Sequence, residues 1–212
     1  MESGTKRLSP GVKHPGTRDA WFNAGYELLT ECGVDAVRIK TLAERLKLTR
    51  SGFYWHFKDH NALLDALIEF WEASNTGLLI AQSEAYAETI TEGMLNLFDC
   101  WHDESKFDPQ LDLAIRNWAR SDSDLRVRLD SADKQRIETV TTMFRRFNFS
   151  EEQAQARGMA VIYTQIGYIS MQVTDDKEMR ISRVPHYVEM FTGLAPSESE
   201  FARFKSRHGY TK

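Results

Sequence analysis

This chain of 212 residues has few cysteines and histidines. The cysteines are Cys32 and Cys100, and the six histidines are spread along the chain. Two thiols make neither a disulfide framework nor a cysteine metal cluster, so we expect both to be reduced, as in a cytoplasmic protein. The cysteines form no Cys-x-x-Cys pair of the kind found in zinc sites. We therefore expect no metal, no cofactor and no catalytic residue, and the chain is predicted not to be an enzyme.

Long apolar runs and phosphate-binding loops are also missing. No stretch approaches the roughly 20 apolar residues of a membrane-spanning helix. Residues 1–18 are polar with scattered basic side chains, unlike the apolar segment of a signal peptide. The twelve glycines never form the G-x-G-x-x-G or Walker spacing. We expect no membrane partner, and nucleotide-dependent catalysis has no support in the sequence.

The net charge of −4 is unevenly distributed along the chain. Residues 1–60 hold ten Lys and Arg against seven Asp and Glu, whereas the remainder holds 17 of the 27 basic and 24 of the 31 acidic residues. A basic end joined to an acidic body suits a protein that brings that end to nucleic acid. Chance variation in surface charge would produce the same asymmetry.

Alternating strand patterns are absent, and apolar residues recur at helical spacing along most of the chain. We predict an all-α protein of nine or ten helices, in which a three-helix unit with a helix-turn-helix is joined to a larger helical body. The predicted boundaries are a flexible basic arm over residues 1–16, a helix-turn-helix domain over 17–60, and a ligand-binding and dimerisation body over 61–212.

Residues 39–60 are typical of two short helices joined by a tight turn. Apolar residues share one face of the first helix at i, i+3, i+4 and i+7, and Thr49 can cap the second, with Phe53 and Phe57 as inner positions. The outer positions combine a small polar start, an aromatic body and cations at both ends, which suits insertion into a DNA major groove. An ordinary helical hairpin with solvated basic residues is the alternative.

The remaining helices are predicted from caps and breaks. A helix capped by Thr17 and ended by Gly33 would support the helix-turn-helix, and Asp59 can cap a longer helix beyond it. Further helices are expected over about 83–102, 109–120 and 125–147, after Ser150, and from about Pro185.

The stretch from Thr17 to Leu64 resembles the DNA-binding region of TetR-family transcriptional regulators. The likeness is carried by the glycine-ended first helix, by Leu42-Ala43-Glu44, and by the aromatic run 53–57 that precedes the next capped helix. It covers about a quarter of the chain, and the body matches only in helical pattern.

Three positions depart from the family pattern. Arg38 stands where a Ser or Thr cap is usual, and Lys47 stands where the turn usually has glycine. His60 replaces a lysine that commonly touches phosphate, so a contact through it would weaken above the histidine pKa.

The resemblance implies a cytoplasmic homodimer that binds a palindromic double-stranded DNA operator. It also implies a small apolar or amphipathic effector, bound in the body, that lowers operator affinity, as in a repressor. Two alternatives stay open: a dimeric DNA-binding factor without a ligand, and a helical enzyme or carrier that keeps the hairpin only for packing.

Three sets of site residues follow. Phosphate and base contacts, with Arg50 as the guanine reader, are assigned to Lys40, Thr41, Thr49, Arg50, Ser51, Gly52, Tyr54, Trp55, His56, Lys58 and His60. Apolar walls with a few polar groups describe a ligand pocket as well as a plain core, and the candidates are Met94, Phe98, Trp101, His102, Trp118, Phe144, Tyr163 and Gln165. The helix after Ser150 is apolar on nearly every face, which favours an oligomer interface there, and the resemblance implies that the last long helix takes part as well. The residues assigned to this dimer interface are Gly158, Ile162, Ile166, Gly167, Ile169, Tyr187, Met190 and Phe191.

Overall fold

The computed structural model describes residues 16–103 and 105–210, which form helices and loops without a strand. The predicted all-α class is confirmed. The predicted arm, residues 1–16, lies outside the described residues apart from Gly16. The chain divides into two compact units, an N-terminal unit (Met1–Glu72 and Gln110–Arg126) and a body (Ala73–Pro109 and Val127–Lys212).

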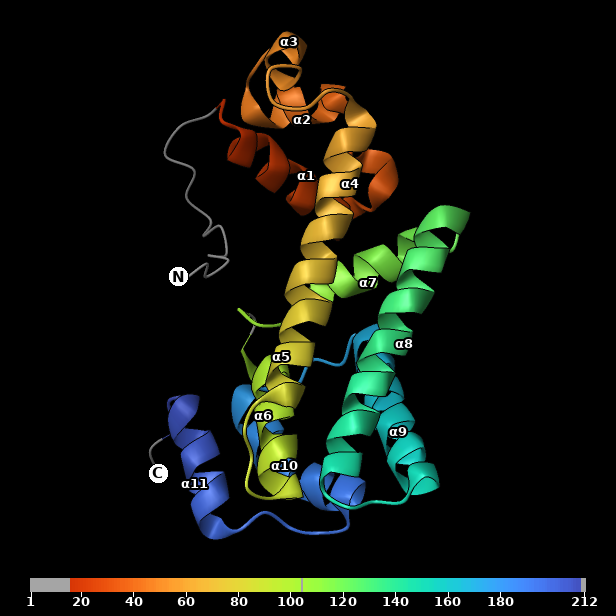
Figure 1. Cartoon of the computed structure of the whole chain (residues 1–212). Helices are drawn as coiled ribbons and strands as arrows, with labels where there is room; N and C mark the ends of the chain where they lie inside the picture. The colour runs from red at the N-terminus through yellow and green to blue at the C-terminus, as the bar shows by residue number, and fades with distance from the viewer. Residues whose placement is uncertain (1–15, 104, 211–212) are drawn as a thin grey trace. The chain divides into compact units, whose positions relative to one another are not determined.

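The N-terminal unit is built around α1 (Figure 1). Thr17 caps this helix by accepting a hydrogen bond from the backbone N–H of Ala20, and Gly33 ends it with a φ of 83°, as predicted. Its helices are α1 (Arg18–Cys32), the 3₁₀ turn η1 (Val34–Ala36), α2 (Ile39–Leu46), α3 (Arg50–Phe53), α4 (His60–Trp71) and most of α7 (Pro109–Trp118).

Two of the departures from the family pattern are visible in α2. Arg38 occupies the N-cap position without a side-chain capping bond. Lys47 adopts the left-handed conformation, with φ 58° and ψ 39°, where glycine would carry no steric cost. The N–H of Leu48 donates to the carbonyl of Ala43 at 2.9 Å, which closes the helix end and compensates that strain in part.

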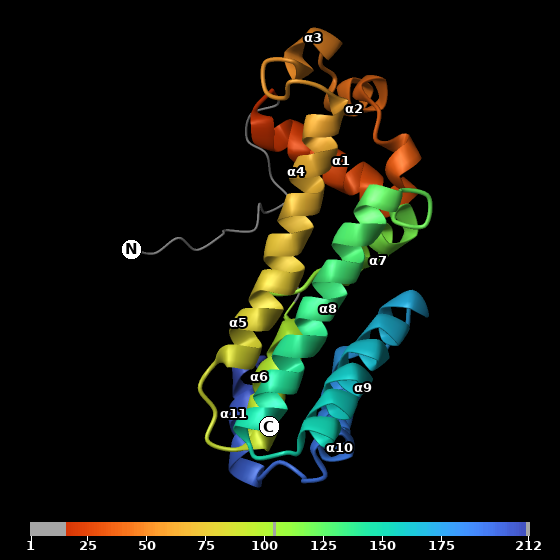
Figure 2. The ribbon, with the colours of Figure 1, turned by 45° about the vertical axis from the view of Figure 1, so that its right-hand side comes forward.

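The body contains most of the remaining helices (Figure 2). They are α5 (Leu78–Glu84), α6 (Ile90–His102), α8 (Ser123–Arg146, whose first residues fall in the N-terminal unit), α9 (Glu151–Ser170), α10 (Lys177–Thr192) and α11 (Glu198–Arg207). A π-helical segment, η2 (Glu72–Gly77), joins α4 to α5 without a break in helical backbone. With α4 and α5 taken as one run, the described residues contain ten α-helices, within the predicted nine or ten.

The start of α10 differs from the sequence prediction. The helix begins at Lys177 instead of Pro185, because Asp176 caps it by accepting from the N–H of Met179 at 2.7 Å. Pro185 lies inside the helix and removes one backbone hydrogen bond. Burial of Ile181 and Val184 in the first half of the helix outweighs that loss. Similarly, α6 begins at Ile90, capped by Thr89, instead of near residue 83.

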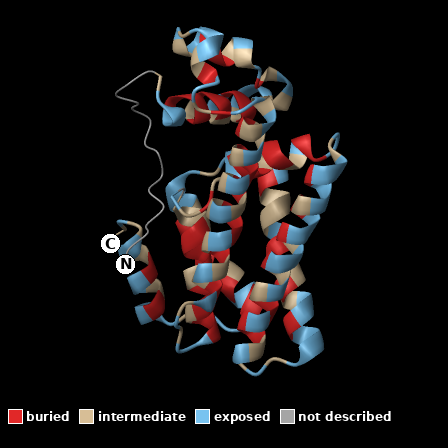
Figure 3. Cartoon of the chain, turned by 45° about the horizontal axis from the view of Figure 1, so that its top comes forward, coloured by how far each residue is buried: buried red, intermediate tan, exposed pale blue. Residues whose placement is uncertain are grey.

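Most helices bury one face and leave the other in solvent, whereas α6 has no exposed residue (Figure 3). In the N-terminal unit the largest fully buried side chains are Trp21, Leu29, Leu42, Phe53, Leu63, Leu67 and Trp71. In the body they are Leu79, Met94, Leu95, Phe144 and Phe204. Within residues 16–103 and 105–210, none of the helices combines the length and the apolar character that crossing a membrane would take.

Gly158 brings α9 close to α8 within the same chain. A Cβ atom at Gly158 would lie 2.4 Å from Oγ1 of Thr141, 3.0 Å from its backbone nitrogen and 3.1 Å from the carbonyl oxygen of Ile137. Real Cβ atoms essentially never approach another atom as closely as the hydroxyl distance, and the two backbone distances are tighter than nine in ten real Cβ contacts. The glycine assigned to a dimer contact is thus already required for packing inside one chain.

Gly158→Ala should destabilise the protein by about 1–3 kcal/mol, because its methyl group would force α9 away from the α8 backbone. Gly167→Ala is the matched control on the same helix, since no atom lies within 4 Å of its Cβ position. The control should change stability by less than about 1 kcal/mol, given the higher helix propensity of alanine. Urea unfolding measures both, and equal effects of the two substitutions would contradict the packing role of Gly158.

Candidate functional site

Aromatic contacts with α1 and with Phe57 hold α3 in position on its buried side. The rings of Trp21 on α1 and Phe53 on α3 meet edge to face with centroids 5.5 Å apart, and Phe53 stacks on Phe57 at 5.4 Å. The guanidinium of Arg18 lies over the ring of Phe57, 4.8 Å from its centroid. Phe53 and Phe57 are buried, as predicted, although regular helix ends at Phe53 and a turn follows.

The outer side of this segment is left in water. Trp55 is 86% exposed and Tyr54 is 58% exposed, an unusual state for such large apolar rings. Arg50, Ser51 and Lys58 are exposed beside them in sequence. The segment therefore presents cations, a hydroxyl and two aromatic rings on a support that is itself rigidly packed.

Lys40, Thr41 and Thr49 flank the segment. Lys40 is exposed, and its Nζ lies 3.8 Å from Oε1 of Glu44 in a solvent-screened pair that leaves it available for other contacts. Thr41 is half-buried. The Thr49 hydroxyl lies 2.9 Å from Oγ of Ser51 and makes no capping bond to the helix backbone. Thr49 thus occupies the predicted cap position without the predicted capping interaction.

Three residues assigned to DNA contact are engaged inside the N-terminal unit. A ring nitrogen of His56 lies 2.6 Å from the carbonyl oxygen of Gly16, and Nε2 of His60 hydrogen-bonds to the carbonyl of Val37. A Cβ on Gly52 would meet the Trp21 ring at 3.6 Å, so this position faces α1. Their geometry supports a role in holding the segment more directly than a role in reading bases.

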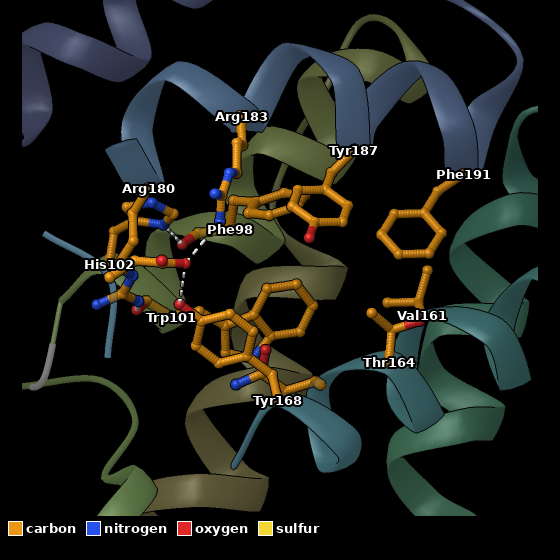
Figure 4. A pocket seen from close by; sticks show the side chains of 12 residues that line it. Phe98, Trp101, His102, Val161, Thr164, Tyr168, Arg180, Arg183, Tyr187 and Phe191 are labelled. Carbon is orange, nitrogen blue, oxygen red and sulfur yellow. Dashed lines mark hydrogen bonds and ion pairs between the residues drawn. The ribbon is translucent and has the colours of Figure 1, made fainter. Parts of the chain in front are cut away.

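A second candidate site is a cavity in the body, formed by α6, α9, α10 and the loop before α10 (Figure 4). It encloses about 570 Å³, including the space at its open mouth. Its lining residues are Phe98, Trp101, His102, Val161, Thr164, Gln165, Tyr168, Asp175, Arg180, Arg183, Tyr187 and Phe191.

Half of the predicted ligand residues line this cavity, namely Phe98, Trp101, His102 and Gln165. Met94 and Phe144 are fully buried in the core, and Tyr163 is mostly exposed. Trp118 belongs to the N-terminal unit. Periodicity alone does not separate cavity walls from core, because both present the same apolar face.

One end of the cavity is polar, which the apolar periodicity of the sequence did not predict. Nη1 of Arg183 lies 2.7 Å from Oδ2 of Asp175, the Tyr168 hydroxyl donates to the same oxygen at 3.0 Å, and Arg180 donates to the carbonyl of Trp101. Starting α10 at Pro185 left Arg180 and Arg183 outside the predicted helix. Asp176 as an N-cap residue was the sequence signal that could have placed both on α10.

His102 is held neutral at this end. Its Nδ1 lies 3.1 Å from the carbonyl oxygen of Phe98, and burial lowers its pKa to about 4, with Arg180 and His208 adding to the effect. Nε2 of His102 and the indole nitrogen of Trp101 are buried, and neither has a hydrogen-bond partner among the described residues. The site therefore carries unmet hydrogen-bonding capacity.

The residues assigned to the dimer interface fall into two groups. Gly158, Ile162, Ile169 and Phe191 are already buried within the single chain, whereas Ile166, Gly167 and Tyr187 are half-buried and Met190 is exposed. Tyr187 and Phe191 also line the cavity. Only the second group retains surface that a partner would cover.

The two thiols differ in their surroundings. Cys32 is exposed, while Cys100 is buried, and burial raises the pKa of the Cys100 thiol to about 12. That thiol stays protonated and unreactive at neutral pH. In the part of the chain that the structure describes, no group of three or more His, Cys, Asp or Glu residues is arranged to hold a metal ion.

The pKa of His102 makes a testable contribution to stability. Folding lowers this pKa from about 6.5, so the unfolded chain binds the proton more tightly. The stabilisation is fully present above pH 6.5 and is lost as the pH falls to 4. His102→Asn removes the titration, so its stability should fall less than that of the wild type between pH 7 and pH 4, by roughly 2 kcal/mol. Parallel stability profiles in urea unfolding would rule out the shifted pKa.

The sequence matches to known proteins fall in the N-terminal unit. The family model described as bacterial regulatory proteins, tetR family, matches residues 22–67. The tetracycline repressor protein class G of Vibrio anguillarum is 54% identical over 46 residues, which are 22% of each chain. The class A protein of Escherichia coli is 48% identical over 54 residues, 26% of this chain and 25% of the relative. The matched segments thus span about a quarter of these relatives.

Solved structures cover most of the chain at low identity. Mycobacterium smegmatis AmtR aligns with 93% of this chain and 97% of its own, with a TM-score of 0.60 and 16% identity. E. coli NemR in its reduced form aligns over 85% and 97%, with a TM-score of 0.58 and 14% identity. At this identity the likeness concerns the fold. The helix-turn-helix sequence of this chain is therefore similar to that of bacterial regulatory proteins of the tetR family, and its fold is shared with solved structures along most of its length.

Proposed function

We propose that this protein is a transcriptional regulator that binds operator DNA through its N-terminal unit. The observation that carries the proposal is the exposed outer side of the α3 segment, with Arg50, Tyr54 and Trp55 in water, over a buried support of Trp21 and Phe53. A rigid element with exposed cations and aromatic rings suits a recognition helix in a major groove.

The exposed residues divide by chemistry. Arg50 and Ser51, at the start of α3, suit base edges, since a guanidinium forms paired hydrogen bonds with guanine. Lys40, Lys58 and the Tyr54 hydroxyl suit phosphates, which position the protein without reading sequence. Trp55 offers an apolar face to a thymine methyl group or a sugar.

We further propose a homodimer that joins through α9 and α10 and binds a palindromic operator. Large apolar side chains remain exposed on these helices and at their ends, namely Tyr163, Met171, Met179 and Met190. Their transfer from water into an interface would be favourable. Two such readers would contact half-sites about one helical turn apart.

The body cavity supports a response to a small molecule. A partly apolar cavity with converging polar groups is the usual form of a ligand site. A ligand that binds the DNA-free state more tightly would lower operator affinity by the same coupling free energy. We propose repression relieved by such a ligand, since the relatives matched through the N-terminal unit are named repressors.

Arg50→Ala should reduce preference for the operator over unrelated DNA about 10–100-fold, because it removes a base contact. Lys58→Ala should weaken binding to all sequences alike and lower the salt dependence by about one counterion. Mobility shift on the protein's own upstream region, over a range of salt, measures both. Unchanged operator preference in Arg50→Ala would remove Arg50 from the recognition role, and the absence of salt-sensitive binding would refute the proposed function.

Met190→Asp should convert a dimer to monomers, because it would bury a carboxylate in an apolar interface. Val127→Asp on α8 is the control, since Val127 is 69% exposed and Met190 is 58% exposed. Sedimentation velocity over a concentration series separates the two species. A Met190→Asp protein that sediments like Val127→Asp would remove this part of α10 from the interface.

A further inference from the structure

At the polar end of the body cavity, the described residues leave one positive charge without a paired carboxylate. Arg183 is paired with Asp175 at 2.7 Å. Arg180 is half-buried, and its hydrogen bond goes to the neutral carbonyl of Trp101; among the described residues no carboxylate pairs with it. A partly desolvated guanidinium without a counter-charge is costly, and an anion beside it would remove that cost.

One lining residue also carries a buried donor. The indole nitrogen of Trp101 is buried and has no acceptor in the described part of the chain. A buried donor without a partner costs free energy until a ligand supplies the acceptor. Arg180 is a charged donor, so the group it favours is an acceptor with negative charge. His102 is neutral here and adds no charge to the balance.

Much of the remaining wall is aromatic. The rings of Phe98 and Trp101 meet edge to face at 5.1 Å, and those of Tyr187 and Phe191 stack at 6.2 Å. In Figure 4, Arg180, Arg183 and His102 gather at one end, while Val161, Thr164 and Phe191 lie at the other. Aromatic walls favour a flat apolar body, for which ring contacts add to burial. The cavity is therefore polar at one end and apolar at the other.

We propose that this cavity binds a monoanionic aromatic carboxylate, with its carboxylate against Arg180 and its ring between Phe98, Tyr187 and Phe191. Two arginines and one aspartate leave one positive charge on the lining, which a single carboxylate neutralises. This ligand class would be that of the small-molecule response proposed above, and its role in regulation rests on that proposed function.

Calorimetry on the full-length protein without DNA tests the charge requirement. The probes are benzoate, 1-naphthylacetate and 4-biphenylacetate, which differ in size, and the neutral 1-naphthylacetamide as a matched control. At least one acid should bind, and 1-naphthylacetate should bind at least about tenfold more tightly than its amide, as expected for hydrogen bonds to a charged group. Equal affinity of acid and amide would overturn the proposal. So would a dissociation constant above about 1 mM for every acid tested.

Arg180→Gln should reduce the affinity for 1-naphthylacetate to that of the amide and leave amide binding unchanged. Arg180→Lys keeps the charge and should retain part of the preference for the acid, so a folding defect in one variant does not decide the test. Arg203→Gln on α11 is the control, because Arg203 pairs with Glu92 at 3.1 Å and is not among the lining residues. Undiminished acid binding by both folded Arg180 variants would also overturn the proposal.

Mobility shift with the same acids separates this inference from the proposed function. Acid binding that leaves operator affinity unchanged supports the ligand class and refutes the ligand-responsive regulation. Operator binding by a protein that takes none of the acids refutes the ligand class and leaves the DNA-binding proposal standing.

Discussion

The edge-to-face contact between Trp21 and Phe53 is the interaction on which the candidate DNA interface depends. The helix α3 spans only Arg50–Phe53, and one turn of helix has no stability of its own because nucleation is costly. Tertiary contact with α1 must therefore hold it in place. Arg18 over Phe57, and the hydrogen bond of His56 to Gly16, extend that support past the end of the helix. The exposed residues owe their fixed presentation to this buried aromatic cluster.

The body differs from the N-terminal unit in that part of its interior is a cavity and is not filled by side chains. Helix α6 supplies Phe98, Trp101 and His102 to the cavity. Asp99 on the same helix contacts α11 instead. The Asp99 carboxylate is buried and pairs with Arg207 at 3.0 Å and His208 at 2.8 Å, which fastens the end of α11 onto α6. A helix anchored on its far side can leave polar groups on its cavity side without partners.

How far the sequence predicts each site depends on where its signal lies. Caps are local, so Thr17, Asp59 and the Ser150–Gln153 capping box could be predicted residue by residue. The left-handed turn at Lys47 followed from a missing glycine. The cavity could not be predicted in the same way, because core and cavity walls share one apolar pattern. The extent of α10 was hidden by Pro185, whose effect depends on how much apolar surface the first half of the helix buries.

The all-α class, the helix-turn-helix and its inner residues Phe53 and Phe57 follow from the sequence alone, because they rest on periodicity and on hydrogen bonds between near neighbours. Which of the assigned residues remain available for contact depends on the packing of distant segments. His56, His60 and Gly52 face the interior of the N-terminal unit, and Gly158 packs against α8, through partners 17 to 40 positions away or on another helix. Among the described residues Arg180 has no carboxylate partner for the same reason: burial and pairing are set by elements that are distant in sequence and adjacent in space.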